Sequence, residues 1–95
     1  MTTYITLLRF TDQGARNLKD SPTRANAYKD AIKGSGVNVL GQYWTTGEYD
    51  GVLILQADTE TKVLHAITQL AAAGNIRPES LRALDAAEFS AIVNG

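Results

Sequence analysis

Residues 46–57 read Thr-Gly-Glu-Tyr-Asp-Gly-Val-Leu-Ile-Leu-Gln-Ala (TGEYDGVLILQA), a polar turn that runs directly into the most apolar segment of the chain. Gly47 and Asp50 are residue types that favour tight turns. Residues 52–55 are all apolar, so a strand here is apolar on both of its faces. Such a strand is typical of the centre of a sheet that is covered on both sides. The stretch therefore predicts a turn followed by a central strand.

Working outward, alternation and turn residues predict four strands, at Thr3–Phe10, Val37–Thr46, Gly51–Ala57 and Ile76–Leu84. Thr11 or Asp12 caps a short helical turn after the first strand. Pro78 cannot donate to a strand ladder, so the fourth strand is expected at an edge.

Two helices are expected between these strands. The first has Ser21 as its N-cap and Pro22 at its first position, and it ends at Gly34 and Gly36. Its predicted buried stripe is Ala25, Tyr28 and Ile32. Asp58 or Thr59 caps the second helix, which ends at Gly74-Asn75. One face of it should pack on the sheet, namely Val63, Ile67, Leu70 and Ala71.

The order of these elements is β-α-β-β-α-β, followed by a short helix that opens at residues 85–88. This order predicts a ferredoxin-like α+β fold with the first and third strands in the centre of the sheet. We expect residues 1–95 to form one domain, since a chain of this length seldom holds two.

Helices cover only one face of such a sheet, yet both faces of three strands carry apolar side chains. Ile5 and Leu7 oppose Leu8 and Phe10, and Leu53 and Leu55 oppose Val52 and Ile54. In the second strand, Val37, Val39 and Tyr43 are expected to oppose Leu40 and Trp44. A second copy of the sheet is the simplest cover, which predicts a homodimer with α/β-barrel character. The alternative is that a long loop or the terminal helix folds over the open face.

Composition excludes several classes of function. The net charge of −1 provides no basic surface for nucleic acid or for an anionic membrane. With no cysteine and one histidine, neither thiolate catalysis nor a transition-metal site is expected, and no cofactor is predicted. We find no secretory signal and no apolar run of roughly 20 residues, so a cytoplasmic location is expected.

Three blocks of sequence resemble the GYD family of small proteins. They are residues 11–22, residues 47–57 with Gly47-Glu48-Tyr49-Asp50, and residues 74–83. The second half is also similar to the effector-binding domain of the Lrp/AsnC regulators, in which a Gly-x-Tyr-Asp turn leads into an apolar strand. That resemblance implies a dimeric α/β barrel, without the DNA-binding segment of those regulators. The GYD family implies no particular activity.

Four residues are candidate ligand-binding residues: Tyr49, Asp50, Trp44 and Arg82. Tyr49 and Asp50 could bind an ammonium or hydroxyl group at the mouth of a cleft, although such residues also build turns without any ligand. Tyr43 and Trp44 are adjacent and should face opposite sides of the sheet. Arg82 could bind a carboxylate if Arg9 points inward beside it.

His65 is expected on the solvated face of the second helix. Trp44 resembles by residue type the pocket aromatics of the cofactor-free monooxygenases of the same superfamily.

The leading hypothesis is a homo-oligomeric module that binds a small metabolite and does not act as an enzyme. The first alternative is a cofactor-independent monooxygenase or isomerase acting on an aromatic substrate. The second is a structural assembly protein. A cavity of about 300 Å³ or more would favour the first two over the third.

Overall fold

The computed structural model describes residues 1–95, and its centre is a four-stranded antiparallel sheet in the order β2-β3-β1-β4. The strands are β1 (Thr2–Phe10), β2 (Asn38–Trp44), β3 (Gly51–Ala57) and β4 (Ile76–Ala83). The α-helices are α1 (Asp12–Arg16), α2 (Ser21–Ile32), α3 (Glu60–Ala72) and α4 (Ala86–Asn94), and a 3-10 turn, η1, spans Leu18–Asp20. The predicted ferredoxin-like α+β fold is confirmed, with β1 and β3 central and β4 at an edge.

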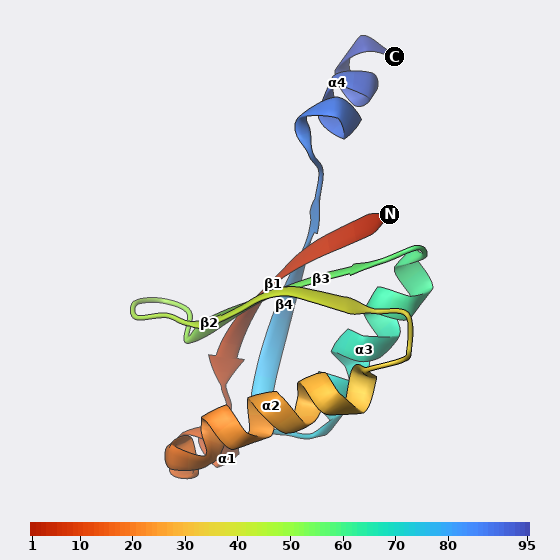
Figure 1. The fold of residues 1–95 in the computed structure, drawn as a ribbon. Helices are drawn as coiled ribbons and strands as arrows, with labels where there is room; N and C mark the ends of the chain where they lie inside the picture. The colour runs from red at the N-terminus through yellow and green to blue at the C-terminus, as the bar shows by residue number, and fades with distance from the viewer.

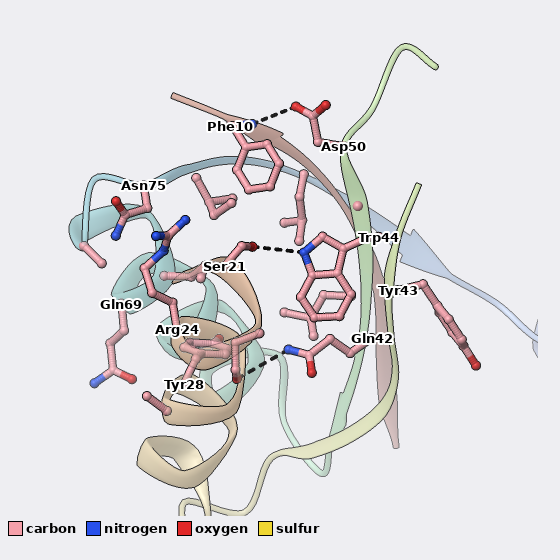
Figure 2. Close-up of a pocket in the computed structure, with 18 of the residues that line it drawn as sticks. Phe10, Ser21, Arg24, Tyr28, Gln42, Tyr43, Trp44, Asp50, Gln69 and Asn75 are labelled. Atoms are coloured by element: carbon pink, nitrogen blue, oxygen red, sulfur yellow. Dashed lines mark hydrogen bonds between the residues drawn. The ribbon is translucent and has the colours of Figure 1, made fainter. Parts of the chain in front are cut away.

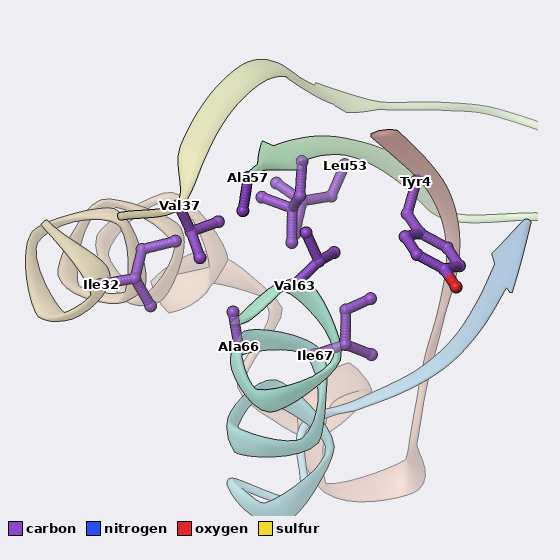
Figure 3. Packing of buried hydrophobic residues seen from close by; sticks show 9 residues of the cluster. Tyr4, Ile32, Val37, Leu53, Ala57, Val63, Ala66 and Ile67 are labelled. Atoms are coloured by element: carbon purple, nitrogen blue, oxygen red, sulfur yellow. The ribbon is translucent and has the colours of Figure 1, made fainter. Parts of the chain in front are cut away.

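Helices α2 and α3 lie on the same side of the sheet (Figure 1). The core forms between this side and α3, where Leu53 and Leu55 of β3 meet Val63 of α3, all three essentially inaccessible to solvent. Ile32 and Val37 extend the core at the end of α2 (Figure 3). Thr6 is also buried, and its hydroxyl lies 3.4 Å from that of Ser80.

A bulge in β2 changes the prediction for two aromatic residues. The register shifts between Val39 and Gly41, so the strict alternation that places Tyr43 with Val39 is wrong. Trp44 pairs with Gly51 and faces the helices, while Tyr43 pairs with Val52 and faces away from them. The two side chains do lie on opposite faces of the sheet, as predicted.

The two helix starts were predicted with different success. Thr59 caps α3, as expected, because its side chain accepts from the backbone N–H of Lys62. The prediction that Ser21 is the N-cap of α2 is wrong. Ser21 is the first residue of the helix and is buried, and its hydroxyl accepts a hydrogen bond from Trp44 instead. Of the stripe expected on α2, only Ile32 is buried; on α3, Ala71 is exposed.

The segments Thr11–Gly14 and Gly74–Asn75 form a brace between the ends of β1 and α3. The Thr11 hydroxyl donates to the Gly74 carbonyl at 2.6 Å, and the Thr11 N–H donates to the Asn75 carbonyl at 3.1 Å. Gly14 packs so closely on Asn75 that an added Cβ would lie 2.1 Å from the Asn75 carbonyl oxygen. Two motif blocks that are distant in sequence therefore serve one structural contact.

Helix α4 stands off the body of the molecule, beyond the end of β4 (Figure 1). It begins with a capping box in which Asp85 and Glu88 each accept from the backbone N–H of the other. It does not fold over the second face of the sheet, so the alternative in which the terminal helix covers that face is wrong. This face, called the open face below, carries a set of apolar side chains: Ile5, Leu7, Tyr43, Val52, Ile54 and Leu81.

Candidate functional site

An apolar cleft of about 380 Å³ lies between α2 and the sheet. Phe10 and Trp44 line its sheet side, and Ser21, Arg24 and Tyr28 line its helix side (Figure 2). The end of α3 and the start of β4 close one end through Leu70, Ala73 and Ile76. This volume exceeds the threshold of about 300 Å³ at which a cavity can hold a small ligand.

The cleft exists because α2 presents small side chains to the sheet. Ala25 and Ala31 line it where larger apolar residues would fill it. Three hydrogen bonds hold the helix at this distance. Trp44 Nε1 donates to Ser21 Oγ at 2.9 Å, Gln42 Nε2 to the Ala25 carbonyl at 3.5 Å, and the Tyr28 hydroxyl to the Ala66 carbonyl of α3 at 2.6 Å.

Two charged residues lie at the border of the cleft. Arg24 donates to the carbonyls of Asn17, at 2.7 Å, and Gly14, at 3.4 Å, and it takes part in none of the three ion pairs of the structure. Asp50 accepts from the Phe10 N–H at 2.9 Å through Oδ2. The border therefore carries one cation and one anion, and each is hydrogen-bonded to backbone groups.

The indole of Trp44 is half exposed although it faces the helices. Burial raises the pKa of Tyr28 to about 12, and its hydroxyl is committed to Ala66. A phenol with so high a pKa is a poor general acid or base near neutral pH. The cleft thus offers apolar area and hydrogen bonds rather than a shielded proton-transfer group.

The structure separates Tyr49 from Asp50, although they are neighbours in the turn. Gly47 has a φ of +117°, as the turn prediction requires. Asp50 lines the cleft and accepts from β1 rather than from the turn itself. The Tyr49 hydroxyl donates to Glu79 at 2.6 Å, and the Arg9 guanidinium lies 4.4 Å from the centre of its ring.

Tyr49 is therefore held away from the cleft by contacts of its own. Its hydrogen bond to the Glu79 carboxylate is also the main cause that raises its pKa above the ordinary value.

Arg82 lies apart from the cleft and from Arg9. In the ladder between β1 and β4, Arg82 is opposite Tyr4, whereas Arg9 is opposite Arg77. Arg82 donates to the Ala83 carbonyl at 2.6 Å and lies 3.7 Å from Glu88, while Arg9 pairs with Glu48 at 2.9 Å. The shared carboxylate site that required Arg9 beside Arg82 does not form, because the two residues lie toward opposite ends of the β1–β4 ladder.

Trp44 and Asp50, two of the residues that the sequence predicted in a ligand site, line the cleft, whereas the residues on its helix side were not predicted. Arg24 and Ser21 are two of the residues that α2 directs into it, three positions apart on one turn. The signal that could have identified them is the run of small side chains on the inner face of α2, since a helix with so little apolar bulk cannot fill the space above a sheet. His65 is exposed on α3, as predicted.

Two apolar surfaces lie outside the cleft. The first is the open face, where Leu81 and Tyr43 are about half exposed or more. The second is α4, where the exposed fractions of Phe89, Ile92 and Val93 are 56%, 61% and 62%. A helix on the surface of a domain usually buries its apolar side chains against that domain, and exposed apolar surfaces of this kind are typical of protein interaction sites.

Three further observations concern metals, membranes and a second hollow. Histidine and carboxylate side chains do not gather in groups of three that could hold a metal ion. None of the helices has the length and apolar character required to cross a membrane. A second hollow, between Met1, Thr3, Gln56 and the connection to α4, has fewer lining residues than the cleft.

Comparisons with known proteins agree with this fold. The model of the GYD domain matches residues 4–93. A protein of Thermus thermophilus named "Glutamine synthetase and cystathionine beta-lyase binding protein" is 33% identical over 92 residues, which cover 96% of this chain and 97% of that one. The crystal structure of the Thermus thermophilus protein TTHA0845 superimposes with a TM-score of 0.57 at 27% identity, over 90% of this chain and 96% of the other. The chain therefore belongs to the GYD domain family.

Proposed function

We propose that this protein is a homodimeric module that binds other proteins, with metabolic enzymes as its partners. The observation that carries the proposal is the presence of two separate apolar surfaces, the open face and α4, neither of which the chain covers itself. The name of the Thermus relative, a binding protein for two enzymes, supports the same reading.

The open face is assigned to self-association. Ile5, Leu7, Val52 and Ile54 occupy the centre of the two inner strands, and polar residues surround them, among them Arg9 and Arg77. An apolar centre with a polar rim is the usual anatomy of a protein interface. Two copies of this face can pack sheet against sheet, with the same residues meeting across a twofold axis.

Helix α4 is assigned to the partner enzyme. Phe89, Ile92 and Val93 recur at helical spacing on one side, whereas Ser90, Ala91 and Asn94 lie on the other. An amphipathic helix that projects from a compact body can lay its apolar side in a groove of another protein. The capping box at Asp85 and Glu88 holds the start of the helix without help from the body.

Two experiments test these assignments. Sedimentation velocity of the wild type should give a dimer, and Ile54→Lys should give a monomer, whereas Thr61→Lys on the exposed side of α3 should not. A wild-type monomer would refute self-association through the open face.

The second experiment measures binding to purified glutamine synthetase and cystathionine β-lyase of the same host by biolayer interferometry. Phe89→Ser with Ile92→Ser should abolish binding, and Ala91→Ser on the opposite side of α4 should retain it. Unchanged binding by the double variant, or no binding by the wild type, would refute the role of α4.

A second candidate function is the binding of a small metabolite in the cleft. The specific observation in its favour is a volume of about 380 Å³ bordered by Trp44, Asp50 and Arg24. Of the four residues expected in a ligand site, this candidate retains Trp44 and Asp50. Retention of a defined extra mass in native mass spectrometry of the protein from its own host, lost on denaturation, would support it.

A cofactor-independent enzyme would need a closed internal pocket with Trp44, Tyr4 or Tyr43 pointing into it. Trp44 lines the cleft, but Tyr4 belongs to the core and the ring of Tyr43 points to the other side of the sheet (Figure 2). The Tyr28 hydroxyl is committed to the Ala66 carbonyl and its pKa is raised to about 12, so it is a poor proton-transfer group, and we favour binding over catalysis.

A further inference from the structure

We infer that the cleft beneath α2 binds a small aromatic carboxylate, whose ring lies among Phe10, Tyr28 and Trp44 and whose carboxylate is held by Arg24. This inference rests on the small-molecule function proposed above and adds the chemical class of the ligand. It assigns the charged anchor to α2 rather than to the turn at residues 47–50.

The size and lining of the cleft set the body of the ligand. Of its 19 lining residues, 12 are hydrophobic, so it favours an apolar group over a sugar or a phosphate. An engineered cavity of about 150 Å³ admits benzene, so 380 Å³ accommodates an aromatic ring with a short side chain or a second ring. Trp44 has an exposed fraction of 51%, which leaves part of the indole free to pack against such a ring.

Arg24 sets the head group. Its guanidinium points along the edge of the cleft toward Asn75 (Figure 2). Its two protein acceptors are neutral carbonyls, and no carboxylate lies within ion-pair distance, so its charge is not balanced by the chain. A guanidinium held in this way still has N–H groups for a carboxylate, which it binds in bidentate geometry.

Asp50 is the acid among the lining residues, but its position does not favour an amine over a carboxylate as the head group of the ligand. Its Oδ2 is occupied by the Phe10 N–H, and the carboxylate lies beyond the Phe10 ring, on the far side of the cleft from Arg24 (Figure 2). A carboxylate bound at Arg24 is therefore separated from Asp50 by the aromatic wall.

The test uses three head groups on the same body: 3-phenylpropionate, 3-phenylpropionamide and 3-phenylpropylamine, repeated with an indolyl ring. Trp44 is the chain's one tryptophan, so in the 15N-labelled protein its indole N–H resonance reports directly on the cleft and is distinct from that of an unlabelled indolyl probe. We expect the carboxylate to bind at least about tenfold tighter than the amide, the effect of one charge-assisted hydrogen bond. This ratio should fall to about 1 in Arg24→Gln and stay unchanged in Arg16→Gln, an exposed control on α1.

Ala25→Leu should abolish binding of every probe, because the larger side chain occupies the cleft. Equal affinity for acid and amide, or tighter binding of the amine, would overturn the carboxylate inference and leave the small-molecule function standing. If no probe perturbs Trp44, and Ala25→Leu raises the melting temperature, the cleft is unoccupied space. In that case both the carboxylate inference and the small-molecule function fail.

Discussion

Gly14→Ala tests whether the brace between Thr11–Gly14 and Gly74–Asn75 is a necessary part of the fold. The new Cβ would lie 2.1 Å from the Asn75 carbonyl oxygen and 3.0 Å from the carbonyl carbon. An ordinary contact begins near 3.4 Å, so one backbone segment must move by more than an ångström. The clashing Asn75 oxygen belongs to the main chain, so no side-chain rotation can relieve the clash.

The expected cost combines two effects. Overpacking of a tight site costs about 1–3 kcal/mol. The displacement also weakens the hydrogen bonds from Thr11 to Gly74 and Asn75, at about 1 kcal/mol each. We therefore expect Gly14→Ala to lower the free energy of unfolding by about 3 kcal/mol, a large part of the roughly 5–14 kcal/mol that stabilises a chain of 95 residues.

Urea unfolding followed by Trp44 fluorescence measures this cost, and Gly34→Ala is the matched control. Gly34 has a φ of +85°, but no atom lies within 4 Å of the position that an added Cβ would take, so it tests backbone strain without contact. That strain costs roughly 1 kcal/mol. If Gly14→Ala costs no more than Gly34→Ala, the close approach to Asn75 is not what selects glycine, and the reasoning is wrong.

Three further predictions concern stability. Tyr28→Phe should cost about 1 kcal/mol at neutral pH through the lost hydrogen bond to Ala66. Because the pKa of Tyr28 is raised to about 12 in the folded state, its contribution is complete below pH 10 and is lost as the pH rises toward 12. Allowing for partial exposure, the wild type should lose about 2 kcal/mol more than Tyr28→Phe over that range in urea titrations, and equal losses would contradict this. Asp50→Ala should cost about 2 kcal/mol in the same titrations, because it leaves the Phe10 N–H without its charged acceptor, whereas Asp50→Asn should cost less than half of that. Asp85→Ala should speed amide hydrogen exchange in α4 by about fivefold, since the cap contributes about 1 kcal/mol, and exchange in β3 should not change.

The sequence by itself determined the order of elements and the positions of most of their ends. Gly51–Ala57 was predicted as observed because four consecutive apolar residues between a turn and a helix cap permit only a central strand. Thr11 and Thr59, each one of two adjacent cap candidates, do cap the helices that follow them, and the last helix begins within residues 85–88 as predicted, since capping depends on residues at most three positions away. Pro78 placed β4 at an edge for an equally local reason, the missing N–H.

Only the tertiary structure decided which side chains share a site. One extra residue at the β2 bulge moved Trp44 to the helix side and Tyr43 to the open face, and alternation cannot reveal where a ladder slips. Serine is a residue type that often caps helices, yet the Ser21 hydroxyl accepts a hydrogen bond from Trp44, which lies in a strand 23 residues further along the chain. Tyr49 and Asp50 are adjacent in the chain but make their contacts with β4 and β1 respectively. Arg24 gained its place beside the cleft from the distance between α2 and the sheet, which depends on packing between elements and is encoded in no single stretch of the chain.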